Sequence, residues 1–227
     1  MKFLHYTVAT LVACLGMAGC VGTEQVRNVQ PSGFLGDYST LRTGGEGEPA
    51  LIYWNPKADF RKYNKVIVER STIWRTPGSS LDDVLKADLE HLAILLTARL
   101  IEAVKREGLS IVREPGPGVM RIRSAITEAE QSAEMLDLVT SVVPLPSLTK
   151  VATGTRAFVG KAGVEGEIRD AMTDERLAAM VDRRAGNRLP SGVPASWNDV
   201  ELAFQYWSDR LAYRLCQERG ATHCVQP

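Results

Sequence analysis

The feature that most constrains the fold is a long apolar stripe between residues 80 and 107. Its members recur at helical spacing: Leu85, Leu89, Leu92, Leu96, Leu100 and Ala103. Ser80 supplies an N-cap hydroxyl, and Asp82 and Asp83 stand in the first turn, where the helix dipole favours carboxylates. Further apolar residues widen the stripe: Ile94, Leu95, Ile101 and Val104. A face of this width predicts a helix that lies flat on a sheet.

Alternating polar and apolar residues predict strands on both sides of this helix. The expected strands are 65–75, 109–113, 119–128, 158–170 and 176–184. The last two form a hairpin whose inward side chains we expect to be Phe158, Ala162, Val164, Ile168, Leu177, Ala179 and Val181. A capping-box pattern at 196–199 then opens a second helix with the stripe Val200, Phe204, Trp207, Leu211 and Leu215. The element order predicts an α+β fold, a single domain with a mainly antiparallel sheet and two long helices on one face.

The start of the chain is typical of a bacterial lipoprotein leader. Lys2 gives a positive charge, an apolar run follows to Met17, and small residues precede Cys20. We therefore expect a signal peptide over 1–19 and lipidation at Cys20; Cys14 also ends a lipobox, but behind a shorter apolar run. Gly22 to Ala50 lacks periodicity and is rich in small polar residues, so 20–50 is expected to be a lipidated cysteine and tether, with the globular domain over 51–227.

The balance of charges bears on which macromolecules the protein binds, and the cysteines bear on a disulfide. The chain has 27 basic and 27 acidic residues, and loss of Lys2 with the leader leaves a net charge of −1. Nucleic acid is not an expected partner, because such proteins present a basic face. Cys216 and Cys224 flank Gly220 near the C-terminus, and in an oxidising compartment they are expected to form a disulfide, with two free thiols as the alternative.

Residues 132–156 are apolar but interrupted by Pro144 and Pro146. Two interpretations remain open: a short helix with a buried crossover, or an exposed flap that contacts a partner or the membrane. In the second case the interaction surface contains Leu136, Val139 and Val143.

No catalytic, cofactor or metal signature stands out. His91 has no second ligand at a suitable spacing, and His223 lies in the C-terminal tail. An acidic set offers the best candidate site: Glu165, Glu167, Asp170 and Asp182. Glu165 and Glu167 share one face of a strand, at a spacing of about 7 Å that suits an acid/base pair. Cross-strand ion pairing on a solvated face, with Arg169, Arg183 and Arg184, explains the same residues and is the favoured interpretation.

Several motifs together resemble a family of bacterial lipoproteins. They are Ser32-Gly33-Phe34-Leu35-x-Asp37-Tyr38-Ser39, Pro56-x-Ala58-Asp59-Phe60-x-x-Tyr63, the hairpin from Gly160 to Gly186 with Val164-Glu165 and Val181-Asp182-Arg183-Arg184, and Trp197 with Tyr206-Trp207. This pattern is similar to the domain of unknown function 3313 over about residues 31 to 216. At the hairpin turn, Ala171-Met172-Thr173-Asp174 departs from the family's Ser-x-Thr-Gly. The resemblance implies no activity, cofactor or catalytic residue.

These observations predict an outer-membrane lipoprotein that faces the periplasm and acts as a structural or interaction module. Its expected partners are the membrane, through the lipid anchor, and other envelope proteins. One alternative is a ligand- or lipid-binding accessory of an envelope transporter, which requires an apolar pocket between helix and sheet. The other is a periplasmic hydrolase that uses Glu165 and Glu167, which requires both carboxylates to line a cleft.

Overall fold

The computed structural model describes residues 22–132, 159–186 and 196–227. In chain order its elements are β1 (Thr23–Gln25), β2 (Arg42–Thr43), β3 (Leu51–Trp54), the 3-10 helix η1 (Phe60–Lys62), β4 (Lys65–Val68), β5 (Thr72–Ile73), the 3-10 helix η2 (Ser80–Asp83), α1 (Lys86–Arg106), β6 (Ser110–Ile111), β7 (Val119–Glu130), β8 (Lys161–Asp170), β9 (Arg176–Gly186) and α3 (Asn198–Glu218).

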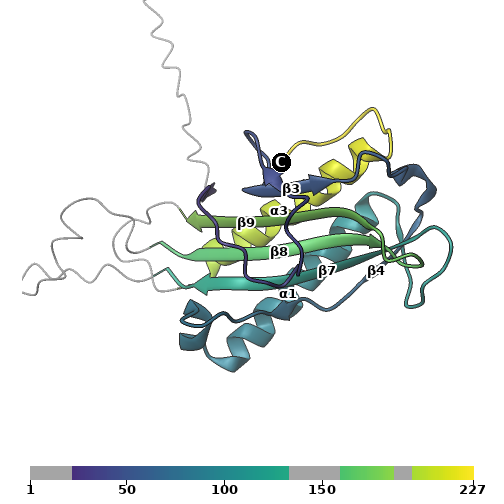
Figure 1. The fold of residues 1–227 in the computed structure, drawn as a ribbon. Helices are drawn as coiled ribbons and strands as arrows, with labels where there is room; N and C mark the ends of the chain where they lie inside the picture. The colour runs from purple at the N-terminus through teal and green to yellow at the C-terminus, as the bar shows by residue number, and fades with distance from the viewer. Residues whose placement is uncertain (1–21, 133–158, 187–195) are drawn as a thin grey trace, which may run out of the picture.

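The strands form one mixed sheet in the order β2-β3-β9-β8-β7-β4-β6, with β1 added to β9 and β5 to β7 (Figure 1). The predicted hairpin is present as antiparallel β8 and β9. The expectation of a mainly antiparallel sheet is wrong, because β4 runs parallel to both β6 and β7, and β5 runs parallel to β7. The physical reason is α1, which lies between β4 and β7 in the chain and provides the long connection that parallel neighbours need. The strand β6 follows α1 directly in the chain and pairs in parallel with β4, and it does not pair with β7, the next strand.

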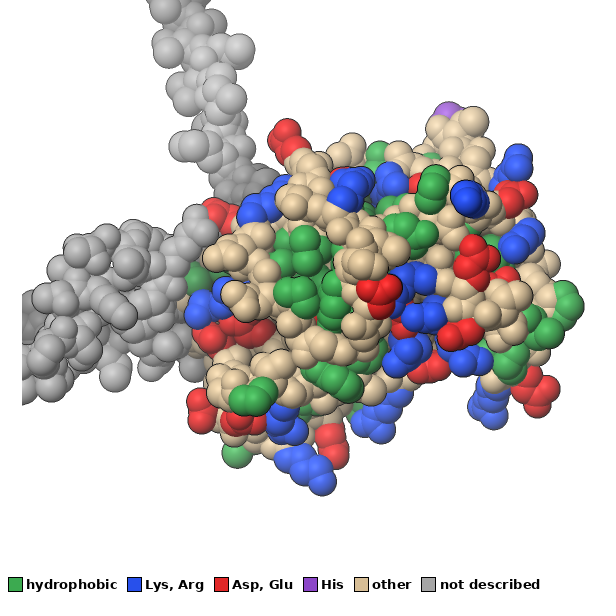
Figure 2. Space-filling model, in the orientation of Figure 1, with side chains coloured by type: hydrophobic (Ala, Val, Ile, Leu, Met, Phe, Trp, Pro, Cys, Tyr) green, Lys and Arg blue, Asp and Glu red, His purple; other side chains and the backbone are tan. Residues whose placement is uncertain are grey.

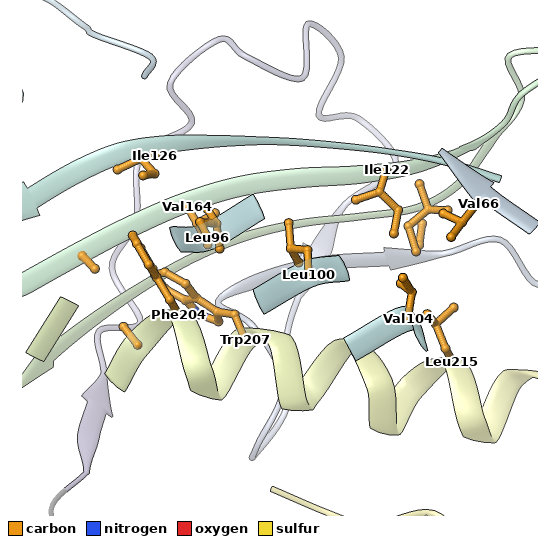
Figure 3. Packing of buried hydrophobic residues seen from close by; sticks show 14 of the residues in the cluster. Val66, Leu96, Leu100, Val104, Ile122, Ile126, Val164, Phe204, Trp207 and Leu215 are labelled. Atoms are coloured by element: carbon orange, nitrogen blue, oxygen red, sulfur yellow. The ribbon is translucent and has the colours of Figure 1, made fainter. Parts of the chain in front are cut away.

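The main core lies between the sheet and the two long helices, which also pack against each other. Figure 3 shows side chains of α1 and α3 meeting those of β4, β7 and β8, among them Leu96, Leu100, Phe204, Trp207, Ile122 and Val164. The predicted helical stripe is buried from Leu89 onward, whereas Leu85 and Ile94 are exposed. Leu85 is exposed because α1 begins only at Lys86; residues 80–83 form η2, capped by Ser79.

The opposite face of the sheet is covered by the N-terminal segment, residues 26–41. Figure 1 shows this segment, in purple, crossing β9 and β8 on the side away from α3. Phe34 and Leu35 are buried there against Ala125, Ala179 and Val181. The tether expected over 20–50 therefore does not describe residues 22–50, which pair and pack with the sheet. It also follows that Ala179 and Val181 point to this second core, away from the helices.

Two further features concern the ends of the chain. None of the described helices is long and apolar enough to cross a membrane. At the C-terminus, Cys216 of α3 is disulfide-bonded to Cys224, eight residues further on.

Replacement of Cys224 by Ser should lower the free energy of unfolding by no more than about 2.5 kcal/mol, because the bond closes a short loop. Urea denaturation of the variant and of the wild type measures this difference. A thiol titration of the unfolded, unreduced wild-type domain should find neither cysteine free; two reactive thiols at these positions would contradict the pairing.

Candidate functional site

Glu165 and Glu167 lie on the same face of β8, beneath the N-terminal segment. Both are buried, with 0% and 2% of their surface exposed. The solvated face expected for them is thus wrong, since residues 32–38 cover it. Burial of a carboxylate is costly without compensating donors, so the contacts of each one indicate what it does.

Glu165 holds the N-terminal segment through its two oxygens. The backbone N–H of Ser32 donates to Oε1 and the hydroxyl of Tyr38 donates to Oε2, each at 2.5 Å. The Tyr38 oxygen also accepts from the backbone N–H groups of Gly33, at 2.8 Å, and Leu35, at 3.2 Å. Burial, with the bond to Glu165, raises the pKa of Tyr38 above its ordinary value. One phenol therefore organises the turn at 33–36 and joins it to the sheet.

Glu167 is surrounded by three arginines. Its carboxylate lies 2.9 Å from the guanidinium of Arg123 and 3.0 Å from those of Arg169 and Arg176. Arg176 reaches further and donates to the carbonyl oxygens of Leu35 and Asp37, at 2.9 and 2.6 Å. This cluster around a buried carboxylate links three strands to the N-terminal segment. Figure 2 shows this face of the molecule, where basic and acidic side chains are interspersed.

Aromatic contacts secure the same segment from the side. Trp74 donates from Nε1 to the carbonyl of Ser32 at 3.1 Å. The rings of Phe34 and Trp74 meet edge to face with centroids 5.5 Å apart, and Arg123 lies 5.3 Å from the Phe34 centroid. Glu165 and Glu167 thus have a structural role, because the hydrogen bonds and ion pairs of each carboxylate hold the N-terminal segment on the sheet.

Asp182 has a comparable role on the helix face. Its Oδ1 accepts from Nε2 of Gln25 at 2.7 Å and from the backbone N–H of Ala50 at 2.9 Å. Its Oδ2 accepts from Nε1 of Trp207 at 2.7 Å. One buried carboxylate therefore joins β1, the start of β3 and α3, and fixes the orientation of the Trp207 ring.

The remaining members of the basic and acidic set are used elsewhere. Arg184 donates to the hydroxyl and carbonyl oxygens of Thr23, and its guanidinium stacks 3.6 Å from the Tyr206 centroid. Arg183 pairs with Glu128 on β7. Asp170 accepts from the Tyr63 hydroxyl at 2.7 Å. Of the three arginines named in the prediction, Arg183 forms an ion pair across strands, Arg169 pairs with Glu167 of its own strand, and Arg184 holds the first residue of β1.

An apolar cavity of about 90 Å³ lies between the sheet and the helices. Its wall includes Leu96 and Leu100 of α1, Trp207 and Leu211 of α3, and residues of β3, β7, β8 and β9. The alternative function of ligand or lipid binding requires an apolar pocket between helix and sheet, and this cavity is such a pocket. It is the second candidate site.

Other sequence-predicted residues add no site. Cys20 and the expected interaction surface Leu136, Val139 and Val143 lie outside the described residues. His91 is exposed on α1. Across residues 22–132, 159–186 and 196–227, no group of three or more His, Cys, Asp or Glu side chains could hold a metal ion.

The sequence analysis missed the partners of the carboxylates, above all Tyr38 and Arg176. The sequence does mark both sides of this contact as unusual. Glu165 and Glu167 interrupt the otherwise apolar or small residues 162–168, and Tyr38 belongs to the first motif that resembles the lipoprotein family. Nothing in the spacing connects the two, since Tyr38 and Glu165 are 127 positions apart.

Comparison with known proteins gives relatives of unknown function. Residues 30–211 match the model of the family described as "Protein of unknown function (DUF3313)". The uncharacterized lipoprotein YdcL of Escherichia coli (strain K12) is 30% identical over 203 residues, which cover 86% of this chain and 88% of YdcL. Among solved structures, the PelC dodecamer from Paraburkholderia phytofirmans has a TM-score of 0.41 at 9% identity, over 76% of this chain and 96% of that one.

Replacement of Tyr38 by Phe should lower the free energy of unfolding by about 1–3 kcal/mol, because it removes a donor from buried Glu165. Urea denaturation measures the effect. Tyr53→Phe is the matched control, since Tyr53 packs in the same small core and no hydrogen bond involves its hydroxyl in the described structure. The control should stay within about 0.5 kcal/mol of wild type. Equal effects of the two changes would contradict the role of Tyr38.

Proposed function

Since the chain belongs to the DUF3313 family and is 30% identical to an uncharacterized lipoprotein over most of its length, we propose that it is a lipid-anchored envelope protein held close to the membrane. The anchor is Cys20, the compartment is the periplasmic side of the outer membrane, and the role is that of a structural or interaction module without catalytic activity. The similarity to the lipoprotein YdcL supports the lipoprotein class. The lipobox before Cys20 supports the anchor. Lipoproteins retained in the inner membrane of enteric bacteria commonly have an aspartate after the lipidated cysteine, and Val21 at this position supports the outer membrane.

The observation that carries the proposal is the position of β1. Its first residue, Thr23, follows Cys20 by three positions, pairs with Gly186 and is held by Arg184. Three residues span at most about 11 Å, at 3.3–3.6 Å each. An acylated Cys20 therefore keeps the domain at the lipid surface, with the end of the sheet at Thr23 toward the bilayer. More than one acyl chain makes such anchoring stable.

The same end of the domain contains the boundaries of the expected interaction segment. Ser132 forms a bridge with Ser196, and Gly160 accepts a hydrogen bond from Gly186. A partner-binding surface at Leu136, Val139 and Val143 would thus belong to a segment that enters and leaves the domain next to the anchor. This placement supports an interaction module that works at the membrane surface.

The hydrolase alternative receives no support from the acidic pair. Acid/base catalysis needs carboxylates that reach a substrate, whereas Glu165 and Glu167 are covered and hydrogen-bonded. The apolar cavity supports a second candidate function, the binding of a small hydrophobic ligand.

Palmitate labelling of membrane-extracted protein tests the anchor. We expect the wild type to be labelled and to sediment with outer membranes, and Cys20→Ala to lose the label because the acylated thiol is gone. Cys14→Ala is the matched control and should keep it. Label retained in Cys20→Ala would assign the anchor to Cys14, and absence of label in the wild type would refute a lipid anchor.

A fluorescent probe on single introduced cysteines tests the orientation in the acylated protein. Gln131→Cys lies beside Ser132, at the end of the sheet near Thr23, and Met172→Cys lies at the opposite end, in the β8–β9 turn; both positions are exposed. Lipid-borne quenchers should quench the first probe more strongly, because the short connection to Cys20 holds that end near the bilayer. Equal quenching would contradict the proposed orientation.

A further inference from the structure

The cavity exists because one row of the sheet has no side chain at Gly166 and only a small one at Ser124. Ser124, Gly166 and Met180 are paired neighbours across β7, β8 and β9, and their side-chain positions face the helices. A Cβ added at Gly166 would meet nothing nearer than 3.5 Å. The rows before and after it are filled, by Ile126 with Val164 and by Ile122 with Ile168. The missing side chain in the central row leaves space beneath the helices.

The walls of this space are apolar and well fixed. Leu96 and Leu100 come from α1, and Trp207 from α3 (Figure 3). The Trp207 ring is held by its bond to Asp182, so this wall does not depend on packing alone. An apolar cavity of this kind stays dry and accepts apolar groups.

The cavity opens between α3 and β3. Trp54, Met180 and Leu211 line it and are only partly buried. Two arginines of α3, Arg210 and Arg214, line the same opening. The opening therefore joins an apolar interior to a cationic rim.

The two arginines differ in how their charge is used. Arg214 forms an ion pair with Glu218 at 2.8 Å and lies 5.1 Å from the Trp54 centroid. Arg210 lies 5.2 Å from the Tyr213 centroid, and within the described ranges no carboxylate comes within ion-pair distance of it. Its Nε, like that of Arg214, is buried and has no hydrogen-bond partner there. The carboxylate of Glu48, on which Arg214 also acts electrostatically, is already paired with Arg42 at 2.8 Å. Arg210 is thus a cation at the rim with donors to spare.

We propose that this cavity binds a single-chain anionic amphiphile, with the end of its alkyl chain beside Gly166 and its acidic head group at Arg210. The inference rests on the second candidate function and adds the ligand class. The size of the cavity sets the depth of insertion: about 90 Å³ is less than the ~150 Å³ that holds a benzene ring, so the chain end enters and the rest lies in the opening. The guanidinium favours a carboxylate or similar oxyanion, because charge-assisted hydrogen bonds are stronger than neutral ones.

Binding of three probes of equal chain length tests this proposal: octanoate, octanol and octylammonium. The protein is the full mature chain with Cys20→Ser, which carries no acyl chains and needs no detergent. Calorimetry measures affinity, and fluorescence of Trp207 and Trp54 reports on the cavity. We expect octanoate to bind about tenfold more tightly than octanol, and octylammonium least tightly, because Arg210 attracts only the anion.

Two variants locate the head group and the chain. Arg210→Gln should remove most of the preference for octanoate and leave octanol binding unchanged. The matched control Arg99→Gln should change neither, because Arg99 is a half-buried arginine of α1 that does not line the cavity. Gly166→Val should weaken octanoate and octanol alike by at least tenfold, because its side chain fills the cavity. Circular dichroism shows whether each variant is folded, and either variant alone suffices for the test.

The outcomes separate this inference from the function on which it rests. Equal binding of octanoate and octanol would overturn the anionic ligand and leave hydrophobic ligand binding intact. Absence of binding by any probe would overturn both. Octanoate binding that survives Gly166→Val would place the ligand elsewhere and refute this cavity as its site.

Discussion

The fold depends on carboxylates that are buried in the sheet and must be satisfied there. Glu165 and Glu167 occupy alternate positions of β8 and are both buried. Burial of a carboxylate in an apolar environment costs free energy unless donors compensate it, whereas on an exposed face water would solvate the two groups. The structure resolves this conflict by bringing a separate stretch of chain over them. Ser32 and Tyr38 donate to one carboxylate, and Arg176 connects the other to the carbonyls of Leu35 and Asp37. The sheet and its N-terminal cover are therefore stable only together.

This requirement gives the protein three layers. Helices α1 and α3 bury one face of the sheet in the large core, and the N-terminal segment buries the other in a smaller one. Asp182 and Arg184 connect the sheet to the helix layer, since both lie on β9 and reach residues of β1 and α3. The stability of the small layer comes mainly from polar and aromatic contacts, because it contains few large apolar side chains. Substitutions of single hydrogen-bonding groups should accordingly matter more there than in the large core.

The sequence predicted those parts of the fold that repeat locally. Periodicity identified α1 from Leu89 onward, α3 and the β8–β9 hairpin, because each has many apolar residues in register with its own geometry. It did not identify the N-terminal cover, because the contacts of this segment are with distant residues, those on β8 and β9 more than 100 positions away, and the segment has no period of its own. The sequence pattern also did not predict the parallel pairing of β4 with β7, because the direction of a strand depends on the path of the helix that precedes it. Of the candidate site, the sequence identified Glu165 and Glu167 but assigned them to a solvated face, because alternation does not reveal what covers the second side of a sheet.

The pairing of β1 with β9 has a consequence for the order in which the protein forms. Thr23 lies at the start of the described chain, and its partner Arg184 follows 161 positions later. Contacts between such distant residues form late, because the closure of a long loop costs entropy before any contact compensates it. The strand β1 therefore cannot pair until β9 has been added to the sheet. Until then the acidic face of β8 has no cover, and the partly folded chain exposes to proteases and to mispairing a surface that the folded protein buries.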